Sequence, residues 1–412
     1  LGYGCFAIPG ALFIKKHSYK SGVLLGLSLY VMGAFIFYPS MLVSGANSTI
    51  GFLMFLLALL ILFAGLSILE TSTNSYVYEL GDSKTATARL NFAQSFNPFG
   101  AITGVIISQV FVLSQLNVMS ASERALLSPT ELATIQRTEL TAVTNTYLAV
   151  GGVMLILLLL IRITKMPDLK EDNKTLDFIN TFKRLFKNKN YVWAVTAQFF
   201  YVGAQIAVWS FTIRYVMDQM NLNEVVARQT SAEGIMNKLR TMEPLAAGFY
   251  NLVDKLGMES LLPRTAEQAG ATYYIIALIM FVVGRFICTF LMRFIKPHHI
   301  LSTLALLAFI CCLITILVGG HVGIYSLVMI SACMSLMFPT IYGMGIKGLG
   351  DDTKIGGSGM VMAIAGAAVL TQIQGVISDQ SGSIKFAYWV PAIAFLIIAY
   401  YSIIVYKKYA TE

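Results

Sequence analysis

Long apolar segments separated by short polar ones dominate the sequence, and most of them are long enough to cross a membrane as a helix. A helix needs about 20 mainly apolar residues to span a bilayer. The pattern predicts eleven spans, at residues 1–14, 21–43, 49–78, 89–116, 144–163, 191–215, 270–294, 299–318, 322–346, 356–378 and 387–406. The predicted fold class is therefore all-α, that of a polytopic membrane protein.

The composition agrees with this pattern and excludes several other classes of protein. Of the 412 residues, 57% are hydrophobic and only 12% are charged, whereas soluble domains carry about 25% charged residues. The five cysteines lie in apolar segments without metal-ligand spacing. The sequence GMGIKG at residues 343–348 matches a dinucleotide motif, but it closes an apolar span and follows no strand. We expect a transporter rather than an enzyme, with no metal.

Basic residues are concentrated in alternate connections, which predicts the orientation of the chain. Most of the 29 Lys and Arg residues follow the odd-numbered spans, and many of them lie in the central connection at 164–190. Short cytoplasmic connections carry an excess of Lys and Arg, so this side and the C-terminus are predicted to be cytoplasmic. The net charge of +8 is then a sign of topology. We expect the lipid bilayer, and no nucleic acid, as the surroundings of the chain.

Two short sequences recur at nearly the same separation, which indicates an internal repeat. LGD occurs at residues 80–82 and 349–351, and GVIISQ at 104–109 resembles GVISDQ at 375–380. Parallel repeats are typical of major facilitator transporters. The predicted domains are an N-terminal helical half (1–163), a cytoplasmic loop (164–190) and a six-helix C-terminal half (191–412). The C-terminal half carries an external insertion at 216–269, which is either a short helical lid or a solvated loop. Nothing in the first half corresponds to the span 191–215, so eleven of twelve helices are expected, with the first missing.

Glu70 is the candidate proton-binding residue. It follows the uncharged segment 50–69, and a carboxylate in hydrocarbon costs several kcal/mol, so it usually has a function there. Asn74 lies one turn further on the same helical face. Lys84 lies about 21 Å further along a helix, so Glu70 is deep if Lys84 marks the membrane surface. The alternative is that Glu70 itself lies at the interface.

Further polar side chains form stripes within apolar spans. Amides and aromatic rings supply the hydrogen-bonding groups and the apolar surface that a sugar needs. For each single side chain, the alternative role is hydrogen bonding between helices. For Arg285 three roles are open: pairing with a carboxylate, contact with the substrate, or extension of its charged end to the membrane interface. The candidates are Asn91, Gln94 and Asn97 in the span 89–116, Gln198, Tyr201, Gln205 and Trp209 in the span 191–215, and Arg285 in the span 270–294.

Four segments resemble the fucose permease family, the fucose–galactose–glucose proton symporters of the major facilitator superfamily. They are LETSTN at 69–74, RLNFAQSFNPFG at 89–100, AQFFYVGAQIAVWS at 197–210, and PTIY at 339–342 with GIKGLGDDTK at 345–354. The resemblance implies twelve helices, alternating access, and the joint movement of one sugar and one proton. It also implies that Glu70 is proton-linked, that Gln94 and Asn97 contact the sugar, and that Gln198 and Gln205 line the cavity.

The sequence departs from that family in three places. The family's aspartate in its first helix has no counterpart here, Phe338 stands where fucose permease has tyrosine, and Ser72, Thr73 and Ser75 replace an Ala-Ala-Asn-Pro pattern. The first departure concerns proton coupling, and the other two leave the sugar open.

The sequence as a whole predicts a proton-coupled sugar symporter of the bacterial inner membrane. We expect a multi-pass monomer, L-fucose or a related hexose as substrate, and no cofactor besides the coupling proton. The alternatives within this class are a glucose/galactose symporter and an uncoupled facilitator. A non-transporting sugar sensor, with residues 216–269 as its interaction surface, is the alternative from another class.

Overall fold

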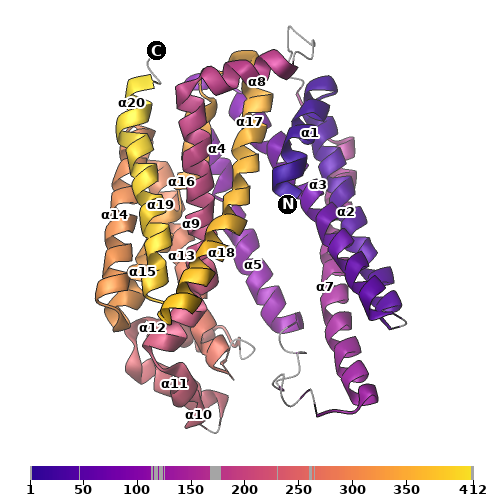
Figure 1. The fold of residues 1–412 in the computed structure, drawn as a ribbon, viewed down its shortest axis with the longest axis vertical. Helices are drawn as coiled ribbons and strands as arrows, with labels where there is room; N and C mark the ends of the chain where they lie inside the picture. Colours follow the sequence, from indigo (N-terminus) through magenta and orange to yellow (C-terminus); the bar gives the residue numbers. More distant parts are fainter. Residues whose placement is uncertain are drawn as a thin grey trace. The chain divides into compact units, whose positions relative to one another are not determined.

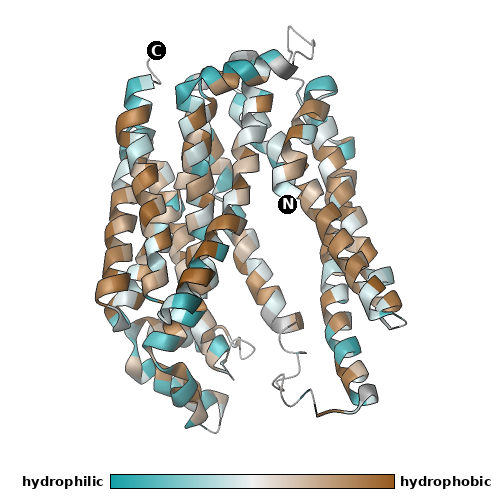
Figure 2. Ribbon diagram, viewed as in Figure 1, coloured by the Kyte–Doolittle hydropathy of each residue, from teal (hydrophilic) through white to brown (hydrophobic). Residues whose placement is uncertain are grey.

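Helices make up all of the regular structure in the part of the chain that the structure describes. The computed structural model describes residues 2–45, 47–112, 115, 119, 124, 126–167, 178–229, 231–258, 262–263 and 265–409. Every regular element within these ranges is an α-, 3-10 or π-helix (Figure 1). Apolar residues follow the lengths of the helices and hydrophilic residues gather at many of their ends (Figure 2). The prediction of an all-α membrane protein is confirmed.

Nine of the eleven predicted spans correspond to helical segments that are long and apolar enough to cross a membrane. Within the described ranges these segments are Tyr19–Ser44 (α2), Ser48–Glu79 (α3), Thr130–Ile163 (in α7, Pro129–Ile163), Lys189–Gln219 (α9), Ala266–Leu291 (α13), Pro297–Leu317 (α14), Gly320–Ile346 (α15, Gly320–Met334, and α16, Met337–Ile346), Thr353–Ser381 (α17, Thr353–Met362, and α18, Gly366–Ser381) and Phe386–Tyr409 (α19, Trp389–Tyr400, to α20, Tyr406–Tyr409). The predicted span 1–14 corresponds to α1 (Gly2–Lys16), a helix of 15 residues.

The predicted span 89–116 is not one continuous helix. It is divided into α4 (Ala86–Gln94), α5 (Asn97–Ile107) and a π-helical turn, η2 (Ser108–Val112). Pro98 is the second residue of α5. Proline has no N–H to donate and suits the first turn of a helix, so it favours a new start at this point over continuation of α4.

Short helices occupy much of the two polar segments. The segment predicted as a cytoplasmic loop contains α8 (Phe178–Lys187). The insertion at 216–269 contains α10 (Leu222–Ala227), α11 (Ala232–Met242) and α12 (Pro244–Lys255). Of the two structures expected for the insertion, the helical one is therefore found, while its action as a lid stays a prediction.

The chain forms two compact units, each held together by close contacts among its own residues. The first unit comprises residues 1–76, 103–177 and 357–362, and the second comprises 77–102, 178–356 and 363–412. The division into functional halves at 164–190 stays a prediction.

Small residues allow the helices of the first unit to approach closely. A Cβ atom on Gly26 of α2 would lie 2.8 Å from the backbone oxygen of Gly65 in α3. A Cβ atom on Gly10 of α1 would lie 2.8 Å from the side chain of Ile68 in α3. Close helix contacts through small residues are typical of membrane proteins, where packing replaces the hydrophobic effect between helices. The contact of α1 with α3 matters for the site because α3 carries Glu70.

The second unit is built around α9, which packs against α13, α16, α18 and α19. A Cβ atom on Gly203 of α9 would lie 2.0 Å from the Leu370 side chain of α18, so this contact also depends on glycine. Buried tyrosines add hydrogen bonds between helices. Tyr201 donates to the backbone oxygen of Met334 at 2.9 Å, and Tyr215 donates to that of Thr315 at 2.9 Å.

Candidate transport site

Glu70 and Asn74 lie one turn apart in α3, and the three hydroxyl residues between them bond to their own helix. The intervening hydroxyls bond to the preceding turn: Thr71 to the oxygen of Ser67 at 2.8 Å, Ser72 to that of Ile68 at 2.6 Å and Thr73 to that of Leu69 at 2.8 Å. This back-bonding is the usual arrangement of Ser and Thr inside a helix. The Glu70 carboxylate is partly buried and hydrogen-bonds with the side chain of Asn74.

Tyr3 of α1 is a second partner of Glu70. Its hydroxyl hydrogen-bonds to the Glu70 carboxylate, and its side chain is itself partly buried. Sequence reasoning missed this residue, since a single tyrosine near the start of the first span has no pattern to mark it. The useful signal would have been the glycines of α1 that bring this helix against α3.

In the second unit, Arg285 of α13 fixes two backbone carbonyl groups. It is only 3% exposed, and its Nε donates to the backbone oxygen of Ser335. Its Nη1 donates to the backbone oxygen of Gln94 at 2.7 Å. The guanidinium carbon also lies 4.7 Å from the centroid of the Phe281 ring, within the range of a cation–π interaction. Arg285 of α13 therefore holds the end of α4 in place within the second unit.

The three polar residues of the predicted span 89–116 are not equivalent. Asn91 is fully buried, and its Nδ2 donates to the oxygen of Thr87 at 2.9 Å and to Oγ1 of Thr340 in α16 at 3.3 Å. Asn91 thus forms a hydrogen bond between helices, which was the alternative to sugar binding for these polar residues. Gln94 is partly exposed and Asn97 is exposed, and the Asn97 amide donates to Oε1 of Gln94 at 3.4 Å.

The polar stripe of α9 contains both structural and unsatisfied groups. Trp209 donates from Nε1 to Oγ of Ser331 at 3.3 Å, so it links α9 to α15, as the Tyr201 hydroxyl also does. Gln205 is partly exposed. Gln198 is fully buried, and neither atom of its amide has a hydrogen-bond partner among the described residues. An unsatisfied buried polar group costs about 1–3 kcal/mol, so this amide is suited to a ligand or a water molecule.

Gln374 of α18 is a second buried amide in the same condition. It is fully buried, and neither of its amide atoms has a partner within the described part of the chain. It shares one face of α18 with Gly366 and Leu370, which lie against α9. Sequence reasoning did not select it, although a glutamine inside an apolar span is the same signal that selected Gln198 and Gln205.

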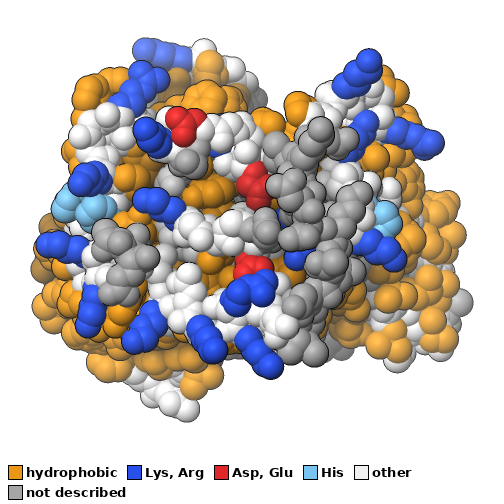
Figure 3. Space-filling model, turned by 90° about the horizontal axis from the view of Figure 1, so that it is seen from above, with side chains coloured by type: hydrophobic (Ala, Val, Ile, Leu, Met, Phe, Trp, Pro, Cys, Tyr) orange, Lys and Arg blue, Asp and Glu red, His pale blue; other side chains and the backbone are white. Residues whose placement is uncertain are grey.

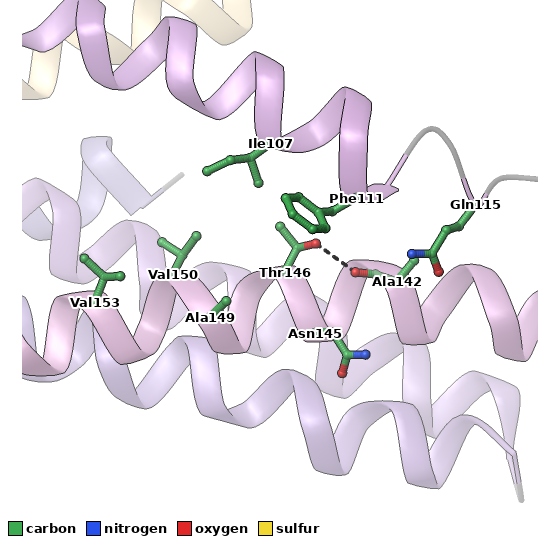
Figure 4. Close-up of a pocket in the computed structure, with 9 residues that line it drawn as sticks. All are labelled: Ile107, Phe111, Gln115, Ala142, Asn145, Thr146, Ala149, Val150 and Val153. Carbon is green, nitrogen blue, oxygen red and sulfur yellow. Dashed lines mark hydrogen bonds between the residues drawn. The ribbon is translucent and has the colours of Figure 1, made fainter. Parts of the chain in front are cut away.

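A cavity of about 340 Å³ lies in the first unit between η2 with the end of α5 and the helix α7. Ile107 and Phe111 point from one side toward Thr146, Ala149 and Val150 on the other (Figure 4). The remaining lining residues are Gln115, Ala142, Asn145 and Val153. The lining is therefore mainly apolar, and its amides lie toward one end of the cavity.

The two corresponding glycines of the internal repeat have different surroundings. Gly104, one turn before Ile107, corresponds to Gly375 of α18. A Cβ atom on Gly375 would lie 3.8 Å from Phe211 of α9, whereas a Cβ atom on Gly104 would meet nothing within 4 Å.

Comparison with known proteins identifies the fold and its family. The chain matches the Major Facilitator Superfamily over residues 1–370. It is 35% identical over 401 residues to the L-fucose-proton symporter of Escherichia coli, which covers 96% of this chain and 81% of that protein. It is 36% identical over 417 residues to the L-fucose-proton symporter of Haemophilus influenzae, which covers 98% of this chain and 86% of that protein. A glucose/galactose transporter of Brucella abortus is 29% identical over 402 residues, covering 98% of this chain and 82% of that protein.

Solved structures give the same result. A crystal structure of the E. coli fucose:proton symporter matches with a TM-score of 0.77 at 35% identity, covering 97% of this chain and 87% of that chain. A bacterial homologue of the iron transporter ferroportin, at 11% identity, matches with a TM-score of 0.58, covering 100% of this chain and 88% of that chain, and shows the shared fold alone. The fold and these matches define a multi-pass membrane transporter. The chain belongs to the Major Facilitator Superfamily and, within it, to the family of these L-fucose-proton symporters. The resemblance found in the sequence is thereby confirmed.

Proposed function

We propose that the chain is a proton-coupled symporter that carries L-fucose into the bacterial cell by alternating access. The bacterial inner membrane, with the C-terminus in the cytoplasm, is its proposed location. The observation that carries the proposal is the Glu70 carboxylate, hydrogen-bonded to Tyr3 and Asn74 within a 32-residue apolar helix. Identity of 35–36% to two L-fucose-proton symporters, against 29% to the glucose/galactose transporter, supports L-fucose over those hexoses.

Glu70 is the proposed coupling group because its surroundings support both of its protonation states. Hydrogen bonds from Tyr3 and Asn74 stabilise a negative charge on the carboxylate, whereas its apolar helix disfavours that charge. The Glu70 carboxyl could therefore bind a proton from outside and release it inside, because both its protonated and its ionised form are supported. Protonation would also remove the charge while the carboxylate lies in the membrane, which lowers the cost of moving it.

The amides of the second unit are the proposed sugar-binding groups. Gln94 and Gln205 are partly exposed and Asn97 is exposed, and Gln198 has an amide without a protein partner among the described residues. Each amide offers one acceptor and two donors, which suits neighbouring sugar hydroxyls. Asn91, Tyr201, Trp209 and Arg285 already bond to other helices, so we assign them the positioning of α4 and α9. Asn74 is assigned to the Glu70 carboxylate.

Proton movement measured with different sugars tests the proposal. The protein in proteoliposomes, or in cells with weakly buffered medium, should make the medium more alkaline when L-fucose is added. D-Galactose and D-glucose should give a smaller signal. Uptake of L-fucose without alkalinisation would favour an uncoupled facilitator, and an equal response to galactose or glucose would favour the hexose symporter. Binding of sugar without uptake would favour the sensor.

A further inference from the structure

A positively charged cavity lies at the end of the second unit where α9 begins and α20 ends. Its volume is about 440 Å³, and it is lined by Arg184, Lys187, Asn188, Lys189, Asn190 and Tyr409. Three of these six are cations, and the lining as described holds no carboxylate. The face of the protein that includes α8 carries many Lys and Arg side chains and few Asp or Glu (Figure 3). This cavity plays no part in the proposed sugar or proton site.

The arginine of the cavity is already engaged, and the lysines supply the excess charge. Arg184 donates from Nε and Nη2 to the two carboxylate oxygens of Asp352, at 2.8 and 2.7 Å. Thr181 donates to the same carboxylate at 3.0 Å. These bonds fix α8 to the segment that follows α16. Lys187 and Lys189, both exposed, therefore give the cavity its net positive charge.

Two details of the cavity favour an anion further. The helix α9, of 31 residues, begins at Lys189, and of its first N–H groups that of Tyr191 is already bonded to the Asn188 side chain at 3.0 Å. The beginning of a helix carries a partial positive charge and N–H groups that lack partners within the helix. Lys189 is held over the Tyr409 ring, with its Nζ 5.2 Å from the ring centroid, so its ammonium group is placed at this end.

The surroundings of the cavity favour a lipid over a soluble anion. The apolar segments Lys189–Gln219 and Phe386–Tyr409 have their ends here, so the cavity lies at a membrane border. Next to it on α8, Phe186 is 72% exposed and contacts the Phe182 ring with the centroids 6.2 Å apart, while Leu185 of the same helix is buried in the protein. An amphipathic helix with exposed aromatic and basic residues at a membrane border is typical of contact with anionic lipid.

We propose that this cavity binds the phosphate headgroup of an anionic phospholipid. Lys187 and Lys189 bind the phosphate, the first turn of α9 adds N–H groups, and Phe186 contacts the lipid chains. The bound lipid thereby links α8 to the bilayer at the point where Arg184 and Asp352 link α8 to the second unit.

Native mass spectrometry of the purified full chain with phosphatidylglycerol, phosphatidylcholine or inorganic phosphate tests this proposal. Each lysine near an anionic membrane contributes roughly fivefold to binding, so Lys187→Gln/Lys189→Gln should lower the affinity for phosphatidylglycerol about 25-fold. The control Lys16→Gln/Lys347→Gln removes the same charge from two exposed lysines outside the cavity and should leave the affinity unchanged. Phe186→Ser should lower retention of phosphatidylglycerol without removing a charge.

Three results would overturn the proposal. The first is equal retention of phosphatidylglycerol by the cavity variant and the control variant. The second is equal retention of phosphatidylglycerol and phosphatidylcholine by the unaltered protein. The third is displacement of phosphatidylglycerol by an equal concentration of inorganic phosphate, which would make the cavity a site for soluble anions. None of these readouts depends on sugar transport, so they are independent of the proposed function.

Discussion

The Tyr3 hydroxyl in α1 hydrogen-bonds to the Glu70 carboxylate in α3. Close packing of the two helices, through Gly10 against Ile68, makes this contact possible. A hydrogen bond to a charged group contributes about 1.5–3 kcal/mol. Tyr3 therefore stabilises the ionised carboxylate that is expected each time the proton leaves.

Replacing Tyr3 by phenylalanine should slow proton-driven accumulation more than sugar exchange. The change removes one donor to Glu70 and keeps the ring, so release of the proton is impaired while the packing is preserved. We expect roughly tenfold slower L-fucose accumulation and little change in counterflow, both measured in proteoliposomes. Tyr147→Phe is the matched control, since the Tyr147 ring stacks on Phe37 at 4.1 Å. Equal effects of the two changes would show that Tyr3 acts only through packing.

Arg285→Lys should damage both stability and transport. Arg285 reaches the carbonyls of Ser335 and Gln94 with different nitrogens of one planar group, and a lysine has a single ammonium. One of the two carbonyl groups would lose its bond, at a cost of about 1–3 kcal/mol. We expect a lower unfolding temperature in detergent and roughly tenfold less transport. Arg214→Lys, at an exposed position, should change neither, and an unaltered Arg285→Lys protein would contradict this role.

Asn91 and Thr340 should prove energetically coupled. Their side chains hydrogen-bond at 3.3 Å between α4 and α16, and both are fully buried. In a double-mutant cycle with Asn91→Ala and Thr340→Val, the free energies of unfolding should deviate from additivity by about 1 kcal/mol. Thr212→Val serves as the control partner, because the Thr212 side chain bonds to Val208 and to Tyr388 rather than to Asn91. Strict additivity of Asn91→Ala with Thr340→Val would exclude the coupling.

The external insertion should behave as an integral part of the second unit. Tyr250 of α12 and Thr272 of α13 are both buried, and their hydroxyl oxygens form a hydrogen bond of 2.7 Å. Deleting residues 216–269 would therefore uncover α13. Tyr250→Phe removes one hydroxyl and should speed proteolysis of the insertion roughly fivefold.

The contribution of the same hydrogen bond to protease protection should not depend on pH near neutrality. Burial raises the pKa of the Tyr250 hydroxyl to about 12, so the hydroxyl keeps its proton well above neutral pH. A raised pKa means that the bond is present at lower pH and is lost only as the pH approaches that value. The difference in protease protection between the unaltered protein and Tyr250→Phe should thus be constant from about pH 6 to pH 9. A difference that changes within that range would contradict this role of the Tyr250 hydroxyl.

Nine of the long apolar segments were readable from the sequence, because a bilayer sets a minimum length for a spanning helix. The division of residues 89–116 into α4 and α5 was not predicted, although Pro98 was a visible signal for it. The contact of Tyr3 with Glu70 could not be read at all, since it depends on how two helices meet. The polar stripes showed where amides lie, but only packing separates Asn91, which bonds to Thr340, from Gln198, which has no described partner.

The Glu70→Gln variant tests the central claim most directly. Glutamine keeps the size and polarity of the side chain but cannot exchange a proton at neutral pH, so only coupling should be lost. In proteoliposomes with a proton gradient, the unaltered protein should accumulate L-fucose and alkalinise the external medium. The Glu70→Gln variant should exchange labelled L-fucose across the membrane without accumulation or alkalinisation. Full accumulation by the variant would contradict a role for Glu70 in proton coupling.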